Sequence, residues 1–315
     1  MSDWKVLITA PYLLPVVDRF ADFFAENGIQ ATKADVEERM EEADLLPVIG
    51  EYDGIVCGDD RITPKVLDAA PKLKVISKWG TGIDSIDSDA AAERGIRVCR
   101  TIDAFTNPVA DSVMGYILSF ARRLPWMDVR MKDGLWGKID GRALNECTIG
   151  VIGVGATGSA TLRRAAPFGA TLLGTDTREI HPGHLASLNV EMVDLETLLE
   201  RSDFVCVHCE LNESSYHLLG ADQFSRMQST AILINLARGP IVDERALVAA
   251  LKTGEIAGAA LDVFEDEPLP SSSALLEMDN VMLAPHNSNS SPKAWERVHW
   301  STLNQLVDGL KAGRG

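Results

Sequence analysis

Residues 151–160, VIGVGATGSA, decide the fold of this chain. Three glycines, Gly153, Gly155 and Gly158, stand in the spacing G-x-G-x-x-G between an apolar run typical of a strand and a segment typical of a helix. In such a turn the first glycine allows the tight bend, the second lets a diphosphate approach the backbone, and the third lets the helix pack on the strand. The order of strand, glycine turn and helix therefore predicts a dinucleotide-binding unit.

An acidic residue ends the next predicted strand. The run ATLLGTD closes on Asp176, at roughly the 20-residue spacing at which a carboxylate binds the adenosine ribose of a dinucleotide. Such a carboxylate accepts hydrogen bonds from ribose hydroxyls and repels a 2′-phosphate, so we predict NAD rather than NADP. Arg178 lies two residues further on and would offset part of that repulsion, which leaves NADP open as the less favoured cofactor. A tight turn followed by a surface carboxylate is the structural alternative.

Composition narrows the classes of partner. The 315 residues suggest two domains, and the apolar fraction of 46% suffices for a sizeable core. The chain has 46 acidic and 30 basic residues, a formal net charge of −16. A surface this acidic disfavours nucleic acid and anionic membranes, so we expect neither as a partner.

Cysteine usage and the first residues indicate a cytoplasmic protein. The odd number of cysteines, mostly within apolar runs, is typical of reduced and buried thiols; they are Cys57, Cys99, Cys147, Cys206 and Cys209. Cys206 and Cys209 have C-x-x-C spacing, but alternation along a predicted strand would point them to opposite faces, so we expect no metal or redox site. The N-terminal sequence lacks the pattern of a signal peptide, and no apolar run approaches the roughly 20 residues of a membrane span.

Strand and helix patterns alternate in two separate stretches of the chain. The first covers about the first hundred residues, and the second begins just before the glycine turn. Each alternation predicts a parallel sheet with helices on both faces. A long apolar helix is expected over about 108–123, an irregular connection over 132–146, and a long amphipathic helix over 291–313.

Polar side chains follow three of the later predicted strands. Arg238 follows AILINLA, Asp262 and Glu267 follow IAGAAL, and His286 follows NVMLAP. Because ligands bind beyond the carboxyl ends of parallel strands, we expect these groups on one rim of the sheet. Arg238 can bind a substrate carboxylate through its planar fork, and His286 can exchange a proton with an oxo or hydroxyl oxygen while Glu267 orients its ring. This set fits hydride transfer between a nicotinamide and a 2-hydroxy or 2-oxo acid; taken singly, each is as well explained as a surface charge or a structural histidine.

Four motifs in order give a resemblance to a known family. The motifs VIGVGATG, NLARGPIVDERALVAAL, GAALDVFEDEP and LAPH follow one another as they do in the D-isomer-specific 2-hydroxyacid dehydrogenases. The chain resembles this family over essentially its whole length, in particular its phosphoglycerate dehydrogenase and hydroxypyruvate–glyoxylate reductase members. The resemblance implies an NAD-dependent oxidoreductase with Arg238, Glu267 and His286 as the catalytic set. It also implies that Asp262 binds the nicotinamide carboxamide.

The resemblance implies further binding residues. Those expected to contact the cofactor are Ser112, Gly153, Gly155, Ala156, Thr157, Gly158, Asp176, His208, Cys209, Ser215, Leu236, Ala237, Arg238, Asp262 and His286. Those expected to bind the substrate are Lys78, Gly80, Thr81, Gly82 and Arg238, the backbone N–H groups of the glycine loop holding the carboxylate. Lys78 suggests a substrate with a second anionic group; the alternative is a solvated lysine that caps a strand. Cys57 and Asp59 could line the same cleft.

The resemblance also implies an architecture. The fold is α/β with two doubly wound parallel-sheet domains, a Rossmann NAD-binding domain inserted in a flavodoxin-like substrate domain. The expected boundaries are 102–286 for the NAD-binding domain and 1–101 plus 287–315 for the substrate domain. A homodimer is expected around the long helix that begins near Pro108.

Departures from the family pattern concern specificity. Asn287 and Asn289 follow the predicted catalytic histidine where the family often has a small, glycine-containing stretch, and Glu210 stands where proline is common. Glu267 argues against the formate-oxidising branch, which has glutamine there, while a phosphite-oxidising branch stays open. A corepressor-like NAD sensor is the alternative from another class; those proteins extend at both ends, and this sequence shows no such extensions. The leading prediction is a dehydrogenase for a small D-2-hydroxy acid of the glycerate–hydroxypyruvate type.

Overall fold

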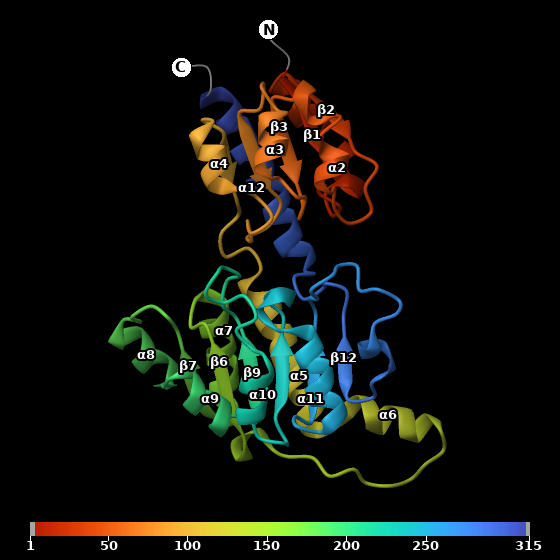
Figure 1. Cartoon of the computed structure of the whole chain (residues 1–315), viewed down its shortest axis with the longest axis vertical. Helices are drawn as coiled ribbons and strands as arrows, with labels where there is room; N and C mark the ends of the chain where they lie inside the picture. Colours follow the sequence, from red (N-terminus) through yellow and green to blue (C-terminus); the bar gives the residue numbers. More distant parts are fainter. Residues whose placement is uncertain (1–3, 313–315) are drawn as a thin grey trace. The chain divides into compact units, whose positions relative to one another are not determined.

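The computed structural model describes residues 4–312 and divides the chain into two compact units (Figure 1). The first unit comprises Met1–Phe105 together with Ser291–Gly315, and the second comprises Thr106–Ser290. These divisions come after residues 105 and 290, where the sequence suggested 101 and 286. Within residues 4–312, no helix combines the length and the apolar character that crossing a membrane requires.

The first unit is built on a five-stranded parallel sheet with the order β2-β1-β3-β4-β5. Its strands are β1 (Trp4–Ile8), β2 (Ile29–Lys33), β3 (Gly54–Cys57), β4 (Val75–Lys78) and β5 (Arg97–Cys99). Its helices are η1 (Leu14–Phe20), α1 (Ala21–Glu26), α2 (Glu42–Leu45), η2 (Ile49–Glu51), α3 (Pro64–Asp68), α4 (Ser88–Glu93) and α12 (Pro292–Ala312). This strand order is that of flavodoxin-like folds, as expected.

The last helix, α12, returns to the first unit and packs against β3, β4 and β5 (Figure 1). The approach is close, because a Cβ added at Gly309 would lie 2.5 Å from a methyl group of Val75. Trp79 Nε1 donates a hydrogen bond of 2.9 Å to His299 Nδ1, and Ser77 Oγ donates one of 2.8 Å to the carbonyl of Thr302. A segment more than 200 residues away in sequence thus covers one face of this sheet.

The second unit is built on a seven-stranded parallel sheet with the order β12-β11-β10-β9-β6-β7-β8. Its strands are β6 (Thr148–Ile152), β7 (Thr171–Thr175), β8 (Glu191–Met192), β9 (Phe204–Val207), β10 (Ile232–Asn235), β11 (Gly258–Leu261) and β12 (Val281–Leu283). Its helices are α5 (Thr106–Arg122), α6 (Leu124–Lys132), η3 (Leu144–Glu146), α7 (Ala156–Ala165), η4 (Ala166–Phe168), α8 (Pro182–Leu188), α9 (Leu195–Arg201), α10 (Ala221–Arg226), η5 (Gly239–Ile241), α11 (Glu244–Thr253) and η6 (Ala274–Glu277).

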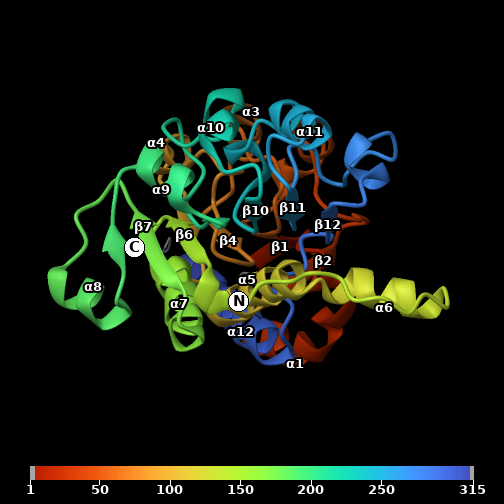
Figure 2. The ribbon, with the colours of Figure 1, turned by 90° about the horizontal axis from the view of Figure 1, so that it is seen from below.

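Two hydrophobic layers hold the second unit together, one on each face of its sheet. Figure 2 shows α9, α10 and α11 on one side of the strands and α5 and α7 on the other. Alternate residues of β9 enter different layers, Val205 and Val207 on the α10 side and Phe204 and Cys206 on the α5 side. Strands buried on both faces need apolar residues at every position, which is why FVCV reads as a continuous apolar run. The predicted fold class of two doubly wound parallel-sheet units is confirmed.

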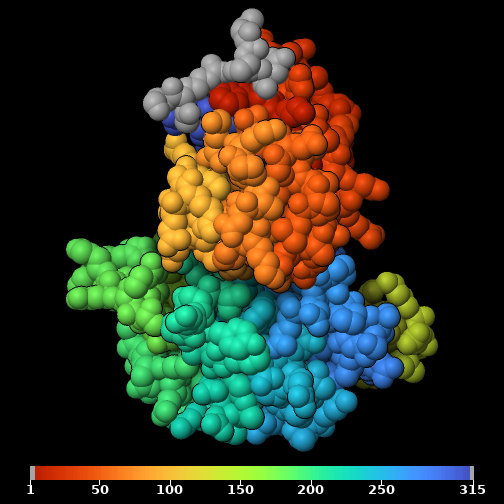
Figure 3. Space-filling view, turned by 45° about the horizontal axis from the view of Figure 1, so that its top comes forward, coloured from red at the N-terminus to blue at the C-terminus, as the bar shows by residue number. Residues whose placement is uncertain are grey.

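Several elements differ from the sequence expectation. The structure adds β2, β8, α2, α6 and α8, which had not been predicted, and β9 ends at Val207, so strand alternation does not extend to Cys209. The helix expected over 108–123 is α5, and the chain turns at Arg123, whose φ of 56° is left-handed. Helix α6 has no buried residue, and a helix without a buried face needs no apolar periodicity in its sequence. This is why it was not predicted. Figures 1 and 3 show this segment projecting from the second unit as a separate lobe.

Candidate functional site

Four polar residues meet at the carboxyl edge of the second unit's sheet. Arg238 follows β10, Asp262 and Glu267 follow β11, and His286 follows β12, and these three strands are neighbours in the sheet. Because the strands are parallel, their carboxyl ends open onto the same edge, where ligands of doubly wound sheets bind.

His286 and Glu267 form a hydrogen-bonded pair. His286 Nδ1 lies 2.9 Å from Glu267 Oε2, and the other carboxylate oxygen accepts a 2.9 Å hydrogen bond from the backbone N–H of Phe264. The two side chains are 23% and 19% exposed, so solvent screens their interaction only partly. The glutamate is thus fixed by its own loop and in turn orients the imidazole, whose Nε2 is the nitrogen turned away from Glu267.

Asp262 holds the turn on which His286 stands. Its side chain is completely buried, and its two oxygens accept hydrogen bonds from the backbone N–H groups of Asn287 (2.7 Å) and Ser288 (2.8 Å). His286 has a left-handed φ of 48°, and its N–H donates to the Asp262 carbonyl at 2.8 Å. A non-glycine residue in this conformation needs such support. In the structure, therefore, the Asp262 carboxylate stabilises this turn through two backbone hydrogen bonds.

Arg238 is held between β10 and the loop that carries Glu267. Asn235 Nδ2 donates 2.9 Å to the Arg238 carbonyl, and Arg238 Nη1 donates 2.8 Å to the carbonyl of Ala237. A Cβ added at the next residue, Gly239, would lie 1.8 Å from the Phe264 carbonyl oxygen, so only glycine permits this approach of the two backbones. The arginine and the histidine–glutamate pair are consequently parts of one packed backbone assembly.

The glycine turn has the shape that a diphosphate requires. Added Cβ atoms at Gly153 and Gly158 would lie 2.7 Å from the Cys209 backbone nitrogen and 2.0 Å from the Gly153 carbonyl oxygen. At Gly155, by contrast, an added Cβ would meet only the Arg178 guanidinium, at 3.4 Å. Gly155 is also the N-cap of α7 and supplies no side-chain cap, so the first N–H groups of that helix are not covered. These residues fit a bound dinucleotide phosphate.

Asp176 lies beside this turn and is strongly hydrogen-bonded. Its carboxylate accepts from the backbone N–H groups of Val154 (2.8 Å) and Arg178 (2.9 Å) and from the Arg178 guanidinium (3.1 Å), and it is only 5% exposed. Burial raises the pKa of Asp176, but these hydrogen bonds outweigh burial and hold its pKa below the usual value. Asp176 is therefore a carboxylate at neutral pH, with the mostly exposed Arg178 lying across it.

The other residues expected near the cofactor occupy varied settings. His208 Nε2 lies 3.1 Å from Thr161 Oγ1, and burial lowers the pKa of His208 to about 4, so it is neutral at pH 7. Cys209 lies against Gly153, and burial raises the pKa of its thiol to about 11.

The remaining residues expected near the cofactor carry no charge. Ser215 is buried, and its hydroxyl donates a 2.6 Å hydrogen bond to the Glu210 carbonyl. Ser112 is half-buried on α5, Leu236 is buried after β10, and the half-buried Ala237 donates its N–H to the side chain of Asn235. Of the remaining two, Thr157 is half-buried and Ala156 is exposed in the first turn of α7.

The glycine loop of the first unit, residues 80–82, begins just after β4. Gly80 has a φ of 132°, a conformation that favours glycine. Thr81 Oγ1 donates 2.8 Å to the Thr101 carbonyl, and Arg100 Nη1 donates 3.2 Å to the Thr81 carbonyl. Lys78, the last residue of β4, is 4% exposed and its ammonium lies 2.9 Å from Asp59 Oδ1. The cation that the sequence placed beside this loop thus has a carboxylate partner.

A second histidine–glutamate pair, in the same loop region as Glu267, was not anticipated. His217 Nε2 lies 2.8 Å from Glu265 Oε1, which also accepts a 3.1 Å hydrogen bond from the backbone N–H of Glu244 at the start of α11. Tyr216 stacks on the His217 ring at a centroid distance of 4.1 Å. The run Glu265-Asp266-Glu267 shows acidity in this loop, but nothing in its spacing points to a pair between Glu265 and His217.

Comparisons with known proteins agree with this geometry. Residues 114–288 match the family model described as the NAD binding domain of D-isomer specific 2-hydroxyacid dehydrogenases. A glyoxylate reductase of Thermofilum pendens is 42% identical over 275 residues, which cover 85% of this chain and 81% of the relative. A D-3-phosphoglycerate dehydrogenase of Methanocaldococcus jannaschii is 37% identical over 98% of this chain, which spans 57% of that relative's length.

A solved structure extends the likeness over nearly the whole chain. The D-lactate dehydrogenase of Aquifex aeolicus, crystallised with NAD and lactic acid, matches with a TM-score of 0.87 and 25% identity over 98% of this chain and 96% of that one. The family model covers more than half of the 315 residues, and the first relative is covered over more than two thirds of its length. The chain therefore belongs to the D-isomer-specific 2-hydroxyacid dehydrogenase family and is an NAD-dependent oxidoreductase of 2-hydroxy acids.

Proposed function

We propose that the protein interconverts a small 2-oxo acid of the glyoxylate–hydroxypyruvate type and the corresponding D-2-hydroxy acid, with Arg238, Glu267 and His286 as catalytic residues. The observation that carries this proposal is the 2.9 Å pair of His286 Nδ1 and Glu267 Oε2 on the strand ends next to Arg238. An acid–base group oriented by a carboxylate, beside a fixed guanidinium, is what reduction of a carbonyl next to a carboxylate demands.

Each residue has a defined task in this reaction. The Arg238 guanidinium binds the substrate carboxylate and polarises the oxo group through charge-assisted hydrogen bonds. His286 delivers a proton from Nε2 to the oxo oxygen, and Glu267 stabilises the imidazolium that gives it. Bound NADH supplies the hydride for the carbonyl carbon. Proton and hydride together convert the oxo acid to the hydroxy acid, and the reverse reaction returns the proton to His286.

The remaining binding roles follow from the same assignment. In the second unit, the uncapped start of α7 and the glycine turn bind the diphosphate, while Asp176 accepts hydrogen bonds from the adenosine ribose. In the first unit, the N–H groups of Gly80, Thr81 and Gly82 hold the substrate carboxylate. Lys78 lies two residues before Gly80 and bears on which substrates the loop admits.

Removing the Asp176 carboxylate tests the cofactor assignment. Asp176→Ala is expected to weaken NADH binding about 10- to 100-fold, because hydrogen bonds to a charged acceptor contribute about 1.5–3 kcal/mol each. NADPH binding should change much less, because the 2′-phosphate gains from the loss of a nearby negative charge and from Arg178. Titration calorimetry with both cofactors measures the ratio.

Glu179→Ala is the matched control, since it removes an exposed carboxylate three residues away. If the NADH-to-NADPH affinity ratio of Asp176→Ala equals that of the control, another residue holds the ribose.

We also propose a homodimer formed around α5 and the projecting lobe that follows it, which comprises residues 124–136. The lobe exposes apolar side chains that one subunit leaves uncovered; they are Leu124 (50% exposed), Val129 (57%), Met131 (51%), Leu135 (52%) and Trp136 (90%). A cluster of large apolar residues in a projecting segment is typical of a subunit interface.

Replacing the most exposed of these residues tests the dimer. Trp136→Asp is expected to shift the protein from twice the subunit mass toward the subunit mass in light-scattering chromatography, because a charge at the centre of an apolar contact is poorly solvated. Phe168→Asp is the control, an equally drastic change at a residue of the same unit that is 45% exposed. Equal masses for wild type and Trp136→Asp would place the subunit contact elsewhere.

The direct test of the proposed function is NADH oxidation with a panel of 2-oxo acids. Glyoxylate, hydroxypyruvate, pyruvate, oxaloacetate and phosphohydroxypyruvate would be compared at one pH, with NADPH in parallel. Turnover with the small acids supports the proposal. Silence across the panel with tight NADH binding contradicts it and shifts the assignment to phosphite oxidation or NAD sensing.

A further inference from the structure

We infer that Asp59 determines the charge of the substrate: by neutralising Lys78 beside the glycine loop, it makes the protein select 2-oxo acids with one negative charge over acids that carry a second anionic group. This inference rests on the proposed function, in which the loop 80–82 holds the substrate carboxylate. It reverses what the sequence suggested, since Lys78 by itself indicated a substrate with two anionic groups.

The sheet itself brings Asp59 to Lys78. Strands β3 and β4 pair in parallel with Cys57 opposite Lys78, and Asp59 comes two residues after Cys57. The Lys78 ammonium lies 2.9 Å from Asp59 Oδ1, the lysine side chain being 4% exposed and the aspartate 33%. A nearly buried ammonium is stable only with a partner, and here that partner is Asp59.

The ion pair lies directly against the loop. A Cβ added at Gly80 would be 3.9 Å from Lys78 Nζ. The backbone N–H of Trp79 donates 2.8 Å to the Cys57 carbonyl, which extends the β3–β4 pairing to the first residue before the loop. The net charge at Lys78 and Asp59 is therefore felt by any ligand that the loop N–H groups hold.

A second acidic residue, Asp60, lies next to this pair in sequence and is held by its own hydrogen bonds. Asp60 is completely buried and accepts hydrogen bonds from Thr9 Oγ1 (2.7 Å), the Gly58 N–H (2.9 Å) and the Met40 N–H (2.6 Å). Burial outweighs these hydrogen bonds and the nearby Lys78 ammonium, so the pKa of Asp60 is raised above its usual value.

Two further charged residues lie close to the loop, Arg100 through a hydrogen bond and Asp84 in sequence. Arg100 donates to the Thr81 carbonyl and so is tied to the loop backbone, and Asp84 is exposed at the end of the loop segment. Arg61 follows Asp60 directly, so cations and carboxylates are both present at this edge, and the charge that Asp59 changes is that of Lys78.

A ligand with one carboxylate accepts the hydrogen bonds of the loop N–H groups and brings no second negative charge toward Asp59. A ligand with a second anionic group brings an uncompensated negative charge toward Asp59, where the cation is already neutralised. At separations of several ångströms near a protein surface, one unit charge changes binding by roughly tenfold or more. Repulsion of the wrong ligand is an efficient source of selectivity.

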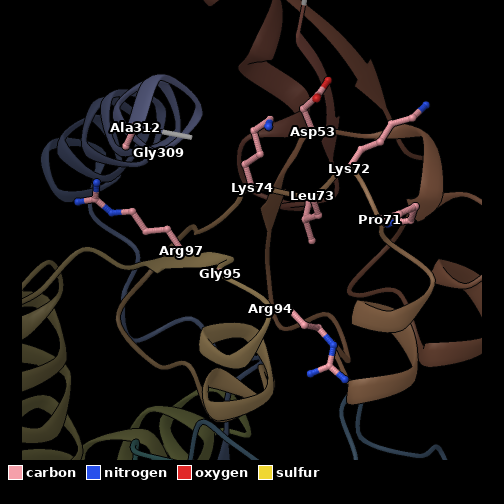
Figure 4. Close-up of a pocket in the computed structure, with 10 residues that line it drawn as sticks. All are labelled: Asp53, Pro71, Lys72, Leu73, Lys74, Arg94, Gly95, Arg97, Gly309 and Ala312. Carbon is pink, nitrogen blue, oxygen red and sulfur yellow. The ribbon is translucent and has the colours of Figure 1, made fainter. Parts of the chain in front are cut away.

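The same strand provides a matched control at its other end. Asp53 directly precedes β3, whereas Asp59 comes after the strand has ended. Asp53 lines a pocket of about 590 Å³ together with Lys72, Lys74, Arg94 and Arg97. Figure 4 shows the charged ends of these four basic residues pointing in different directions, so they do not converge on one anion. Asp53→Asn changes the total charge as Asp59→Asn does, but far from the loop.

The experiment compares the wild type, Asp59→Asn, Asp59→Glu and Asp53→Asn. Values of kcat/KM are measured for glyoxylate and hydroxypyruvate against phosphohydroxypyruvate and oxaloacetate. In parallel, calorimetry with NADH present gives the dissociation constants of D-glycerate and 3-phosphoglycerate, because NADH cannot accept a hydride from a hydroxy acid and these complexes do not turn over. Asp59→Ser is a second variant without the charge, and thermal melting shows that each variant is folded.

We expect Asp59→Asn and Asp59→Ser to raise the preference for the doubly charged ligand at least tenfold in both measurements. Asp59→Glu and Asp53→Asn should keep the wild-type preference. The inference is overturned if Asp59→Asn and Asp53→Asn give the same ratio, or if the wild type already prefers the phosphorylated ligands. Absence of turnover in the wild type contradicts the proposed function alone, because the calorimetric ratio still tests the role of Asp59.

Discussion

Arg238→Ala is expected to lower kcat/KM for a monoanionic 2-oxo acid by about 10²–10³-fold. The guanidinium supplies charge-assisted hydrogen bonds to the carboxylate and to the oxygen on which negative charge develops, and loss of one such donor costs about that factor. The main chain should stay in place, because it is held by Asn235 and by the close contact of Gly239 with Phe264. Steady-state kinetics with NADH and glyoxylate or hydroxypyruvate measure the loss.

Lys78→Ala is the comparison for this prediction. Its ammonium is paired with Asp59, and its removal leaves that negative charge uncompensated beside the loop, so a monoanionic substrate should lose about tenfold. Arg238→Lys keeps the charge without the planar fork and should recover only part of the activity. Equal losses for Arg238→Ala and Lys78→Ala would show that Arg238 is not the principal carboxylate ligand.

His286→Asn is expected to reduce kcat by about 10²–10⁴-fold, the usual contribution of a general acid–base group. Asparagine is the appropriate replacement because His286 has a φ of 48°, a conformation that asparagine tolerates better than most residues. The hydrogen bonds from Asn287 and Ser288 to Asp262 involve backbone N–H groups and should survive the change. The loss should therefore fall on kcat, with NADH binding largely retained in a fluorescence titration.

Glu267→Gln separates orientation from charge. Glutamine can still accept the Phe264 N–H and contact the imidazole, but it no longer stabilises the imidazolium. We expect a loss in kcat that is clearly smaller than that of His286→Asn. An unchanged kcat in His286→Asn would remove this histidine from the proton transfer, whatever the glutamine variant does.

Much of the architecture could be read from local pattern. The strand before Gly153 and the helix after Gly158 follow from alternating structure and from a turn that only glycine fits, because added Cβ atoms would strike the backbone. The continuous apolar run of β9 predicts a strand buried on both faces, and two hydrophobic layers do enclose it. By contrast, α6 has no fully buried residue, and its sequence carries no apolar periodicity from which a helix could be predicted.

The candidate site was predictable as a set of residues on one rim. Arg238, Asp262 and His286 each follow an apolar run, and parallel strands bring such positions to a common edge. The sequence also named Glu267 as the residue that orients His286, and the two side chains lie 2.9 Å apart in the structure. The pair of His217 and Glu265 was not predictable, because it depends on the loop paths that follow the strands.

The sequence by itself determined two parallel α/β sheets, a glycine turn shaped for a dinucleotide and the residue types available at the strand ends, since these depend on short-range periodicity and sterics. Only the tertiary structure decided the charge that surrounds the substrate loop. From the sequence, Lys78 is a cation beside that loop. The register of β3 against β4 brings Asp59 Oδ1 to 2.9 Å from its ammonium and neutralises it. Electrostatics depend on distances between groups far apart in the chain, and those distances exist only once the sheet has formed.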